Sequence, residues 1–292
     1  MKLSNSASRG LAAAVFVTPA TVLYAIFILV PAAVVVGLAF FDWNFFAAPE
    51  FVGVANFERA VVDADLWKAA GVTVQFLLLG VVPTVFVGFL IAVLVNADLP
   101  GVGVLRVLYF IPVVVSVAVS GVLWGFLFDP RQGPIAAALK TFGIVPPDFL
   151  SSTIFALPSV TLVMIWAALP IVVVFYLAGL QRVPPDIYDA AALDGASRWR
   201  TIWSITWPNV VGTTALVTVL QVANFSAASL DFSLVLTKGG PLGATRSLGL
   251  YAYEAAFSHQ EVGYASTISI VQILMILTLL VIGHRVSKVV AR

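Results

Sequence analysis

The chain has 292 residues, of which 61% are hydrophobic and only 10% are charged. A soluble domain carries about 25% charged residues. This chain could not cover a core with polar surface in water, so it is predicted to be an all-α integral membrane protein surrounded by membrane lipid. A net charge of +1 gives no reason to expect a nucleic acid partner.

Metal and thiol chemistry find little support in the composition. The chain contains no cysteine, which excludes disulfides, thiolate metal sites and a cysteine nucleophile. Its two histidines, His259 and His284, lie far apart in the sequence. We therefore expect no metal site.

Six apolar stretches are long enough to cross a bilayer, which requires about 20 residues in a helix. They cover about residues 13–40, 70–96, 104–128, 154–180, 209–235 and 264–284. Several contain proline, which membrane helices tolerate when neighbouring helices satisfy the freed carbonyls. The first stretch exceeds the roughly 7–15 apolar residues of a signal peptide, so it is predicted to be a retained helix. Residues 1–292 are expected to form a single transmembrane domain.

Basic residues predict the orientation. Lys and Arg are more numerous in the short segments on the side of the termini than on the other side, which favours cytoplasmic termini. The predicted cytoplasmic set is Lys2, Arg9, Arg106, Arg182, Arg198, Arg200, Arg285, Lys288 and Arg292, and the outer set is Arg59, Lys68, Arg131, Lys140, Lys238 and Arg246.

The long segment 181–208 between the fourth and fifth stretches predicts two short helices. Pro184 and Pro185 suit a helix start, and Gly195 suits the residue after a helix end. Ser197 can cap a second helix, which Pro208 is expected to end before the next span begins. Such a helix–glycine–helix elbow could fit a socket on another protein. It could also lie on the membrane surface, with its tryptophans at the interface.

The elbow resembles the cytoplasmic signature of binding-protein-dependent ABC importer permeases. The matching residues are Asp189-Ala190-Ala191, Asp194-Gly195-Ala196, Ile202, Ile205 and Trp207-Pro208. Asp replaces the usual Glu at 189, and Trp replaces the usual Leu at 207. The resemblance implies that the elbow is a coupling helix, in which Asp189, Ala190, Ala191, Asp194, Gly195 and Ala196 contact an ATPase subunit.

Other motifs resemble the sugar-type permeases, more narrowly the first-subunit type of the maltose and glycerol-3-phosphate importers. They are 51–57 (FVGVANF), 123–130 (LWGFLFDP) and 236–241 (LTKGGP). The resemblance implies a type I importer fold in the plasma (inner) membrane of a bacterium or archaeon. It implies four partners: a second homologous permease, two ATPase subunits that bind ATP and Mg, and an extracytoplasmic sugar-binding (lipo)protein. No cofactor is expected in this chain.

The fifth stretch gathers polar groups, which are costly inside a membrane and often functional. Hydroxyl and amide groups can bind sugar hydroxyls, and an aromatic ring can pack on a sugar ring. The predicted substrate path contains Gln221, Asn224, Phe225, Ser226, Ser229, Asp231, Trp166 and Ser116. By resemblance, Phe225, Ser226, Ser229, Asp231 and Trp166 match family positions, whereas Gln221, Asn224 and Ser116 are predicted as polar groups within the stretches. Ser120, Ser269 and Gln272 are further candidates. Any of the serines could instead bond to its own helix, and Asp231 could be a structural cap.

Several alternatives remain open. No Walker A loop occurs, so ATP hydrolysis is expected in another subunit and the chain is expected not to be an enzyme. An ion-coupled transporter would require intramembrane carboxylates or histidines, for which only Asp231 is available. A membrane enzyme would require converging acidic or histidine side chains. An importer of glycerol-3-phosphate-like or glycerophosphodiester solutes would favour a cationic pocket, and no Lys or Arg lies deep in the stretches.

Overall fold

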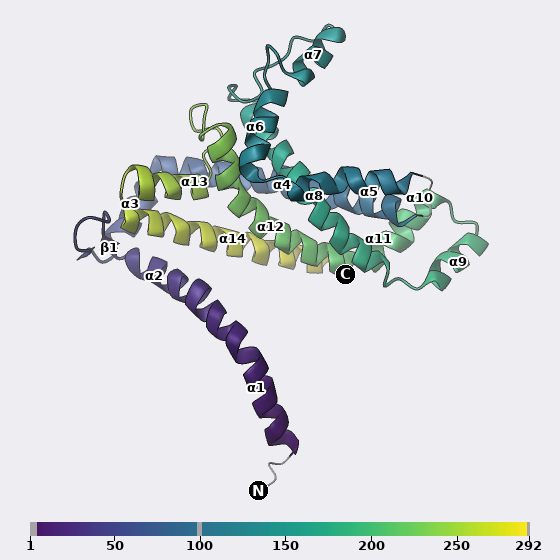
Figure 1. The fold of residues 1–292 in the computed structure, drawn as a ribbon, viewed down its shortest axis with the longest axis horizontal. Helices are drawn as coiled ribbons and strands as arrows, with labels where there is room; N and C mark the ends of the chain where they lie inside the picture. The colour runs from purple at the N-terminus through teal and green to yellow at the C-terminus, as the bar shows by residue number, and fades with distance from the viewer. Residues whose placement is uncertain (1–4, 98–100, 291–292) are drawn as a thin grey trace. The chain divides into compact units, whose positions relative to one another are not determined.

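The computed structural model describes residues 5–97 and 101–290, and most of them are helical (Figure 1). They form two compact units. The first unit runs through Asp63 and includes Ala252–Val271, and the second contains Ala64–Tyr251 and the residues from Gln272 onward. The single permease domain remains a prediction.

The first part of the chain contains α1 (Asn5–Tyr24), the π-helix η1 (Ala25–Leu29), α2 (Val30–Leu38), β1 (Phe41–Asp42), β2 (Glu50–Phe51), α3 (Ala55–Val62) and α4 (Ala64–Asn96). The middle part contains α5 (Val102–Phe110), the 3-10 helix η2 (Ile111–Val114), α6 (Val117–Leu127), α7 (Pro134–Thr141), α8 (Ala156–Leu180) and α9 (Pro185–Leu193). The last part contains α10 (Arg198–Thr201), the π-helix η3 (Ile202–Thr206), α11 (Trp207–Asn209), α12 (Val211–Leu236), α13 (Leu248–Tyr253), the π-helix η4 (Glu254–Ser258) and α14 (Val262–Val290).

Five helical segments are long and apolar enough to cross a membrane. They are Ala14–Leu38, Ala64–Asn96, Ala156–Leu180, Val211–Leu236 and Val262–Gly283. These segments confirm five of the six predicted spans, including the first stretch. The second begins at Ala64, earlier than the predicted start near residue 70.

The third predicted span is not one continuous helix. Residues Val102–Val114 and Val117–Leu127 form a pair bent by 113°. Pro112 lies in the 3-10 turn, Val115 is extended (φ −94°, ψ 119°), and the hydroxyl of Ser116 accepts a hydrogen bond from the Val119 N–H. The predicted stretch over 104–128 is therefore a bent pair of helices, because Pro112 cannot donate to the helix and Ser116 begins a new one.

The first unit is held together by a hairpin and by bonds to main-chain carbonyls. Strands β1 and β2 pair antiparallel, with Phe41 opposite Phe51. The side-chain amide of Asn56 donates to the carbonyls of Ala39 and Phe41, each at 3.0 Å. Gly263 lies so close to the carbonyl of Phe41 that a Cβ there would be 1.8 Å from the oxygen. Only glycine fits at this crossing.

A charged cluster joins α3 to the start of α14 within the same unit. Arg59 forms an ion pair with Glu261 at 2.8 Å, and its guanidinium lies 3.8 Å from the centre of the Tyr264 ring. The Tyr264 hydroxyl donates to the Asp63 carboxylate. The cation–π contact and the two polar bonds reinforce one another.

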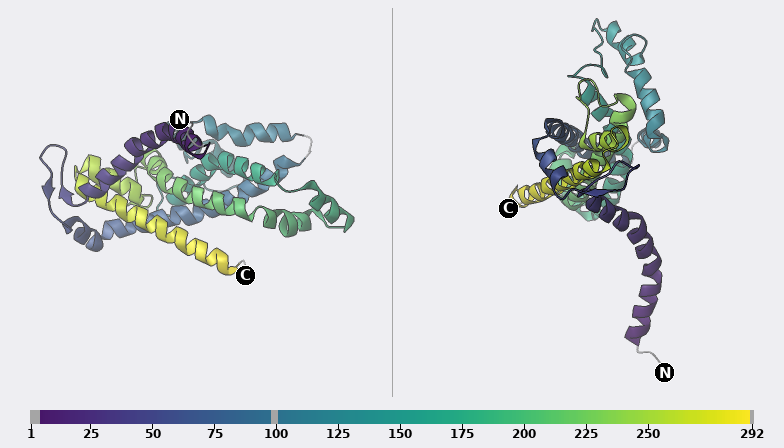
Figure 2. Two further views of the ribbon diagram at one scale, coloured as in Figure 1. Left: turned by 90° about the horizontal axis from the view of Figure 1, so that it is seen from below. Right: turned by 90° about the vertical axis from the view of Figure 1, so that its left-hand side faces the viewer.

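The second unit is built on α4, α8 and α12, which lie side by side (Figures 1 and 2). Glycines allow this close approach. A Cβ at Gly80 of α4 would be 2.0 Å from the Phe225 ring of α12, and one at Gly88 would be 2.4 Å from Val172 of α8. Small residues at helix contacts are the usual means of close packing in membranes, where lipid offers no hydrophobic force to drive helices together.

Buried hydroxyls in this bundle bond mostly to their own helices. Thr73, Thr84 and Thr161 each donate to the carbonyl four residues earlier. Other bonds connect different elements. For example, Tyr176 of α8 donates to Thr214 of α12 at 3.1 Å, and the Leu248 N–H donates to Thr73 at 2.8 Å. Polar groups in a lipid-surrounded bundle are thereby satisfied without water.

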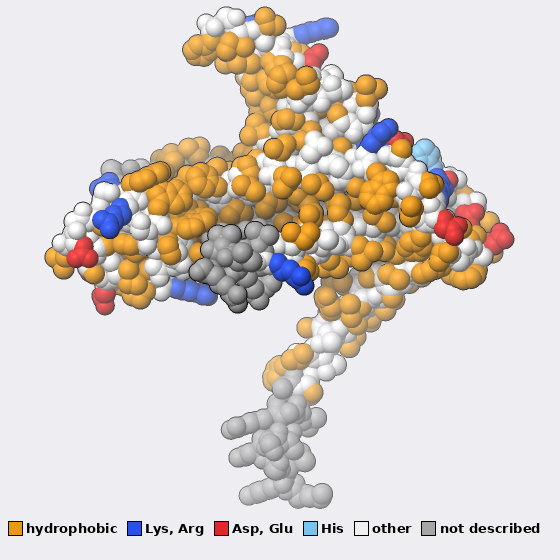
Figure 3. Space-filling view, turned by 180° about the vertical axis from the view of Figure 1, so that it is seen from behind, with side chains coloured by type: hydrophobic (Ala, Val, Ile, Leu, Met, Phe, Trp, Pro, Cys, Tyr) orange, Lys and Arg blue, Asp and Glu red, His pale blue; other side chains and the backbone are white. Residues whose placement is uncertain are grey.

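The outer surface is apolar. Figure 3 shows a face on which hydrophobic side chains predominate and Lys, Arg, Asp and Glu are few. None of the window Ala14–Leu38 is buried, and side chains such as Phe16 and Phe27 are exposed. These surfaces fit contact with lipid or with other apolar chains.

We expect Gly80→Ala to destabilise the bundle, because the added methyl group collides with the buried Phe225 ring. Overpacking of this kind costs about 1–3 kcal/mol. The measurement is the thermal unfolding midpoint of the purified protein in detergent. Gly71→Ala, on the same helix with no atom within 4 Å of its Cβ, is the matched control. A Gly80→Ala midpoint equal to that of Gly71→Ala would contradict the packing.

Candidate functional site

The elbow at 181–208 projects from the end of α8 (Figures 1 and 2). Its first helix, α9, begins at Pro185. The first N–H groups of a helix have no partner within it, so the lack of an N–H in proline costs no hydrogen bond there. Its second helix, α10, begins after Ser197, whose hydroxyl accepts from the Arg200 N–H at 3.3 Å. Both predicted helix starts are confirmed.

The turn between the two helices depends on Gly195. Its φ is +70°, in the left-handed region that favours glycine. The Ala196 N–H donates to the Ala191 carbonyl at 2.9 Å, and the Gly195 N–H donates to the Ala192 carbonyl at 3.1 Å. This pair of bonds is a Schellman motif, which fixes the direction in which the chain leaves α9.

The residues of the signature are mostly on the surface of the elbow. Asp189, Ala190, Asp194 and Gly195 are exposed, Ala196 is half-buried, and Ala191 is buried. Leu193, among them on α9, is 90% exposed. A Cβ at Gly195 would meet no atom within 4 Å. The elbow thus presents small and apolar groups flanked by carboxylates, and another protein can approach its backbone closely.

Aromatic rings tie the base of the elbow to the bundle. Trp207 packs edge-on against Phe89 of α4 with ring centres 4.8 Å apart, and Trp203 lies 5.9 Å from Phe86. Phe89 also contacts Tyr176 of α8 at 5.5 Å. A displacement of the elbow would therefore be transmitted to α4 and α8 through rigid rings.

The sequence predicted that Pro208 ends the helix that precedes it, and this prediction was wrong. The helical path runs through η3 and α11 to Asn209, and the break comes at Val210 (φ −104°, ψ 11°). Pro208 lies in the first turn of α11, where proline is tolerated. The five-residue π-helix just before it accommodates the change in hydrogen bonding.

The predicted substrate-path residues of α12 divide between two environments. Gln221, Phe225, Ser226 and Ser229 are buried, whereas Asn224 and Asp231 are exposed in this chain. The two exposed residues are seven positions apart, so they lie on one helical face. This face is open to a solute or to another chain.

Hydrogen bonds occupy most of the buried group. Ser229 donates to the Ser226 carbonyl at 2.8 Å, and Gln272 of α14 donates to the Ser226 hydroxyl at 2.7 Å. The Asn224 amide donates to the Gln221 side-chain oxygen at 3.1 Å. This last bond holds Asn224 in place and leaves its carbonyl oxygen to accept.

The other predicted residues belong to α6, α8 and α14. Trp166 of α8 packs edge-on against Trp124 of α6 at 5.6 Å, and Ser116 is exposed at the start of α6. Ser120, Ser269 and Gln272 are buried or half-buried, and Ser269 donates to the Ala265 carbonyl.

Three buried polar atoms have no partner among the described residues: the indole nitrogens of Trp124 and Trp203 and the hydroxyl oxygen of Ser233. The sequence reasoning did not single out Trp124 or Ser233 as site residues. Ser233 continues the helical row of Ser226 and Ser229, and that spacing was the available signal. In residues 5–97 and 101–290, no three His, Cys, Asp or Glu side chains could hold a metal ion.

The comparisons with known proteins agree with these features. The family model of the binding-protein-dependent transport system inner membrane component matches residues 85–292. The chain is 30% identical over 247 residues to the trehalose/maltose transport system permease protein MalF of Thermococcus litoralis, covering 85% of this chain and 83% of the relative. It is 28% identical over 239 residues to the multiple sugar-binding transport system permease protein MsmF of Streptococcus mutans, covering 82% of each.

A solved structure supports the fold. The chain matches a chain of the bacterial alginate ABC transporter, solved in complex with an alginate pentasaccharide-bound periplasmic protein, with a TM-score of 0.81 and 19% identity. The match covers 100% of this chain and 99% of that one. With its apolar spans and its elbow, this multi-pass membrane protein belongs to the family of inner membrane components of binding-protein-dependent transport systems.

Proposed function

We propose that the chain is a permease subunit of an ATP-driven importer that moves a carbohydrate delivered by an extracytoplasmic binding protein. The family membership and the sugar-transport names of its relatives support this proposal. The chain itself carries no hydrolytic step, and ATP and Mg bind to partner ATPase subunits.

The elbow is the observation that carries the proposal. Its exposed Asp189, Ala190 and Gly195 surface fits a cleft of an ATPase subunit on the cytoplasmic side. When ATP closes the ATPase pair, the elbow moves as a rigid unit because the Schellman bonds hold its angle. The Trp207–Phe89 contact passes this movement to the spans, and the solute path changes its access.

The solute path follows the exposed face of α12. Asn224 offers an amide already oriented by Gln221, and Asp231 offers a carboxylate on the same face. Ser226 and Ser229 act mainly in packing, because both hydroxyls are engaged within the protein. A second homologous permease subunit completes the path by covering this face.

A phosphorylated solute is the second candidate, because the chain is also 28% identical over 229 residues to the sn-glycerol-3-phosphate transport system permease protein UgpA of Agrobacterium fabrum. A phosphate would favour a cationic site. Neither α8 nor α12 contains Lys or Arg. This absence from the two helices favours a neutral sugar.

The whole proposal is tested by purifying the chain from its native membrane in mild detergent and identifying the proteins that accompany it. We expect a second permease and two copies of an ATPase. A chain that is recovered alone, and whose sugar uptake follows an ion gradient, would replace the proposal with an ion-coupled carrier.

We predict that Gly195→Val abolishes ATP-dependent sugar uptake while the protein still reaches the membrane. A β-branched residue at φ +70° is strained and will change the elbow angle. Uptake into membrane vesicles and the amount of co-purified ATPase are the two measurements.

Gly195→Asn is the matched control for this experiment, because asparagine tolerates the left-handed region and the site has room for a side chain. It should retain most of the uptake. Equal uptake by Gly195→Val and the unmodified protein would show that the turn does not couple ATP to transport.

We predict that Asn224→Ala raises the sugar concentration needed for half-maximal uptake by about tenfold, the effect of losing one to two solute hydrogen bonds. Ser229→Ala should change it little, because that hydroxyl bonds to its own helix. Uptake kinetics with several sugars provide the measurement. If the two variants behave alike, Asn224 does not bind the solute.

A further inference from the structure

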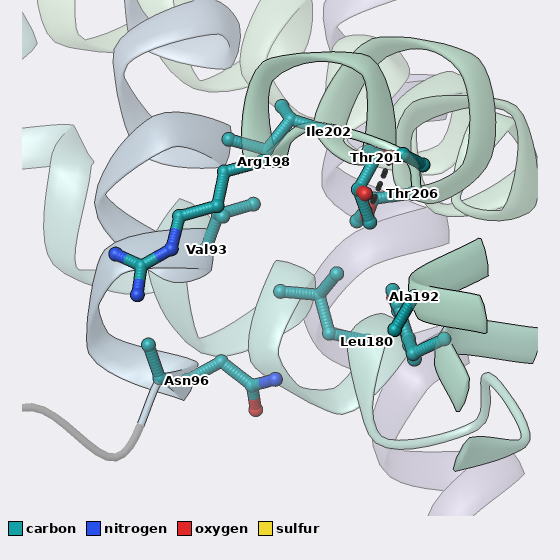
Figure 4. Close-up of a pocket in the computed structure, with 11 residues that line it drawn as sticks. Val93, Asn96, Leu180, Ala192, Arg198, Thr201, Ile202 and Thr206 are labelled. Atoms are coloured by element: carbon teal, nitrogen blue, oxygen red, sulfur yellow. Dashed lines mark hydrogen bonds between the residues drawn. The ribbon is translucent and has the colours of Figure 1, made fainter. Parts of the chain in front are cut away.

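A cavity of about 520 Å³ lies where the second unit passes from its spans into the elbow (Figure 4). Val93 and Asn96 line it from the last turns of α4, and Leu180 lines it from the end of α8. α9 and the α10–η3 segment close the remaining walls. Since α4 and α8 both end here, the cavity is at the level of one membrane surface.

Hydrogen-bond donors line one part of this cavity. The Arg198 side chain extends along it toward Asn96 (Figure 4), and Tyr188 contributes a hydroxyl group, whereas the Thr201 hydroxyl already donates to the Ser197 carbonyl at 3.1 Å. Arg198 forms no ion pair with any residue that the structure describes. No Asp or Glu is among the lining residues. A guanidinium that forms no such ion pair, beside an amide and the Tyr188 hydroxyl, suits a phosphate group.

Apolar groups line the other part. Val93, Leu180 and Ile202 contribute aliphatic side chains. On the same segment Trp199 is 69% exposed, and tryptophan is typical of the level where lipid headgroups meet acyl chains. A ligand that fits both parts has an anionic head and an apolar body.

Nearby charge favours the same ligand. Arg182 and Arg200 are exposed on the elbow close in sequence to the cavity walls. Clustered cations at a membrane surface attract anionic lipids, and each contributes about 1 kcal/mol. Asp186, Asp189 and Asp194 balance the three arginines over the whole elbow, so the attraction is local to the cavity that Arg198 lines.

We propose that this cavity binds the phosphate headgroup of an anionic phospholipid from the adjacent leaflet. Arg198 and Asn96 hold the phosphate, and the acyl chains pass along Val93 and Leu180. The lipid fills the space between the elbow and the span ends, so it contacts both the inner face of α9 and the ends of α4 and α8. Tyr188 and Ala192 of α9 face the cavity, whereas Asp189 and Leu193 do not line it, so lipid and an ATPase can occupy the elbow together.

The test measures lipid binding to the purified full chain, with whatever subunits accompany it, by native mass spectrometry in detergent with added phosphatidylglycerol or phosphatidylcholine. We expect one phosphatidylglycerol to bind in preference to phosphatidylcholine. Arg198→Gln should weaken this binding about tenfold, as the loss of charge-assisted bonds predicts. Arg200→Gln, which removes the same charge from the same helix but not from the cavity, should weaken it less than about twofold.

Ala192→Phe provides an independent variant, because it fills the cavity without removing a charge. It should also abolish the phosphatidylglycerol preference. If Arg198→Gln and Arg200→Gln weaken phosphatidylglycerol binding equally, the preference comes from diffuse electrostatic attraction, and the proposed site in the cavity is wrong. Inorganic phosphate that binds at the same place and displaces the lipid at equal concentration would assign the cavity to a soluble phosphate compound instead. Neither outcome depends on transport, so a failure here leaves the proposed importer function untouched.

Discussion

The absence of water inside a bilayer is the constraint on which this structure depends. Each unsatisfied backbone group in lipid costs several kcal/mol, so helices must satisfy their own bonds and side-chain hydroxyls must find partners in the protein. Thr84 and Ser229 do so by donating to their own helices, and Tyr176 does so by reaching Thr214. Where Pro112 removes a donor, the chain bends and starts again at Ser116 instead of continuing.

The same constraint explains why so few polar groups remain available for function. On α12 the buried serines are engaged in packing, and the exposed face keeps Asn224 and Asp231. Composition alone could not distinguish the buried serines of α12 from the exposed Asn224 and Asp231. The period of the helix placed them on neighbouring faces, but which face was buried depends on where α4 and α14 pack. The contact of Phe225 identifies the buried face, because its ring lies against Gly80, a residue 145 positions earlier in the chain.

Much of the fold could nevertheless be predicted from the sequence. Long apolar stretches predict spans because lipid requires them, and five were found as expected. The elbow was predicted in detail, since Gly195 and Ser197 act locally through backbone conformation and capping. The bend at Pro112 and the wrongly predicted helix end at Pro208 have one cause. Whether a proline bends a membrane helix depends on neighbouring helices and on nearby π or extended residues, and neither is visible in the local sequence.

The two faces of α9 show how one short helix can serve two neighbours. Residues four apart share a face, so Tyr188 and Ala192 look toward the span ends, while Asp189 and Leu193 belong to the rest of the surface. The Schellman bonds fix the angle of the helix, and the Trp207–Phe89 contact fixes its base. A force on the outer face is passed to α4 through the rings at this base, and a ligand in the cavity behind α9 would add a second connection. Whatever occupies the cavity next to Arg198 therefore influences how stiffly the elbow connects to α4 and α8.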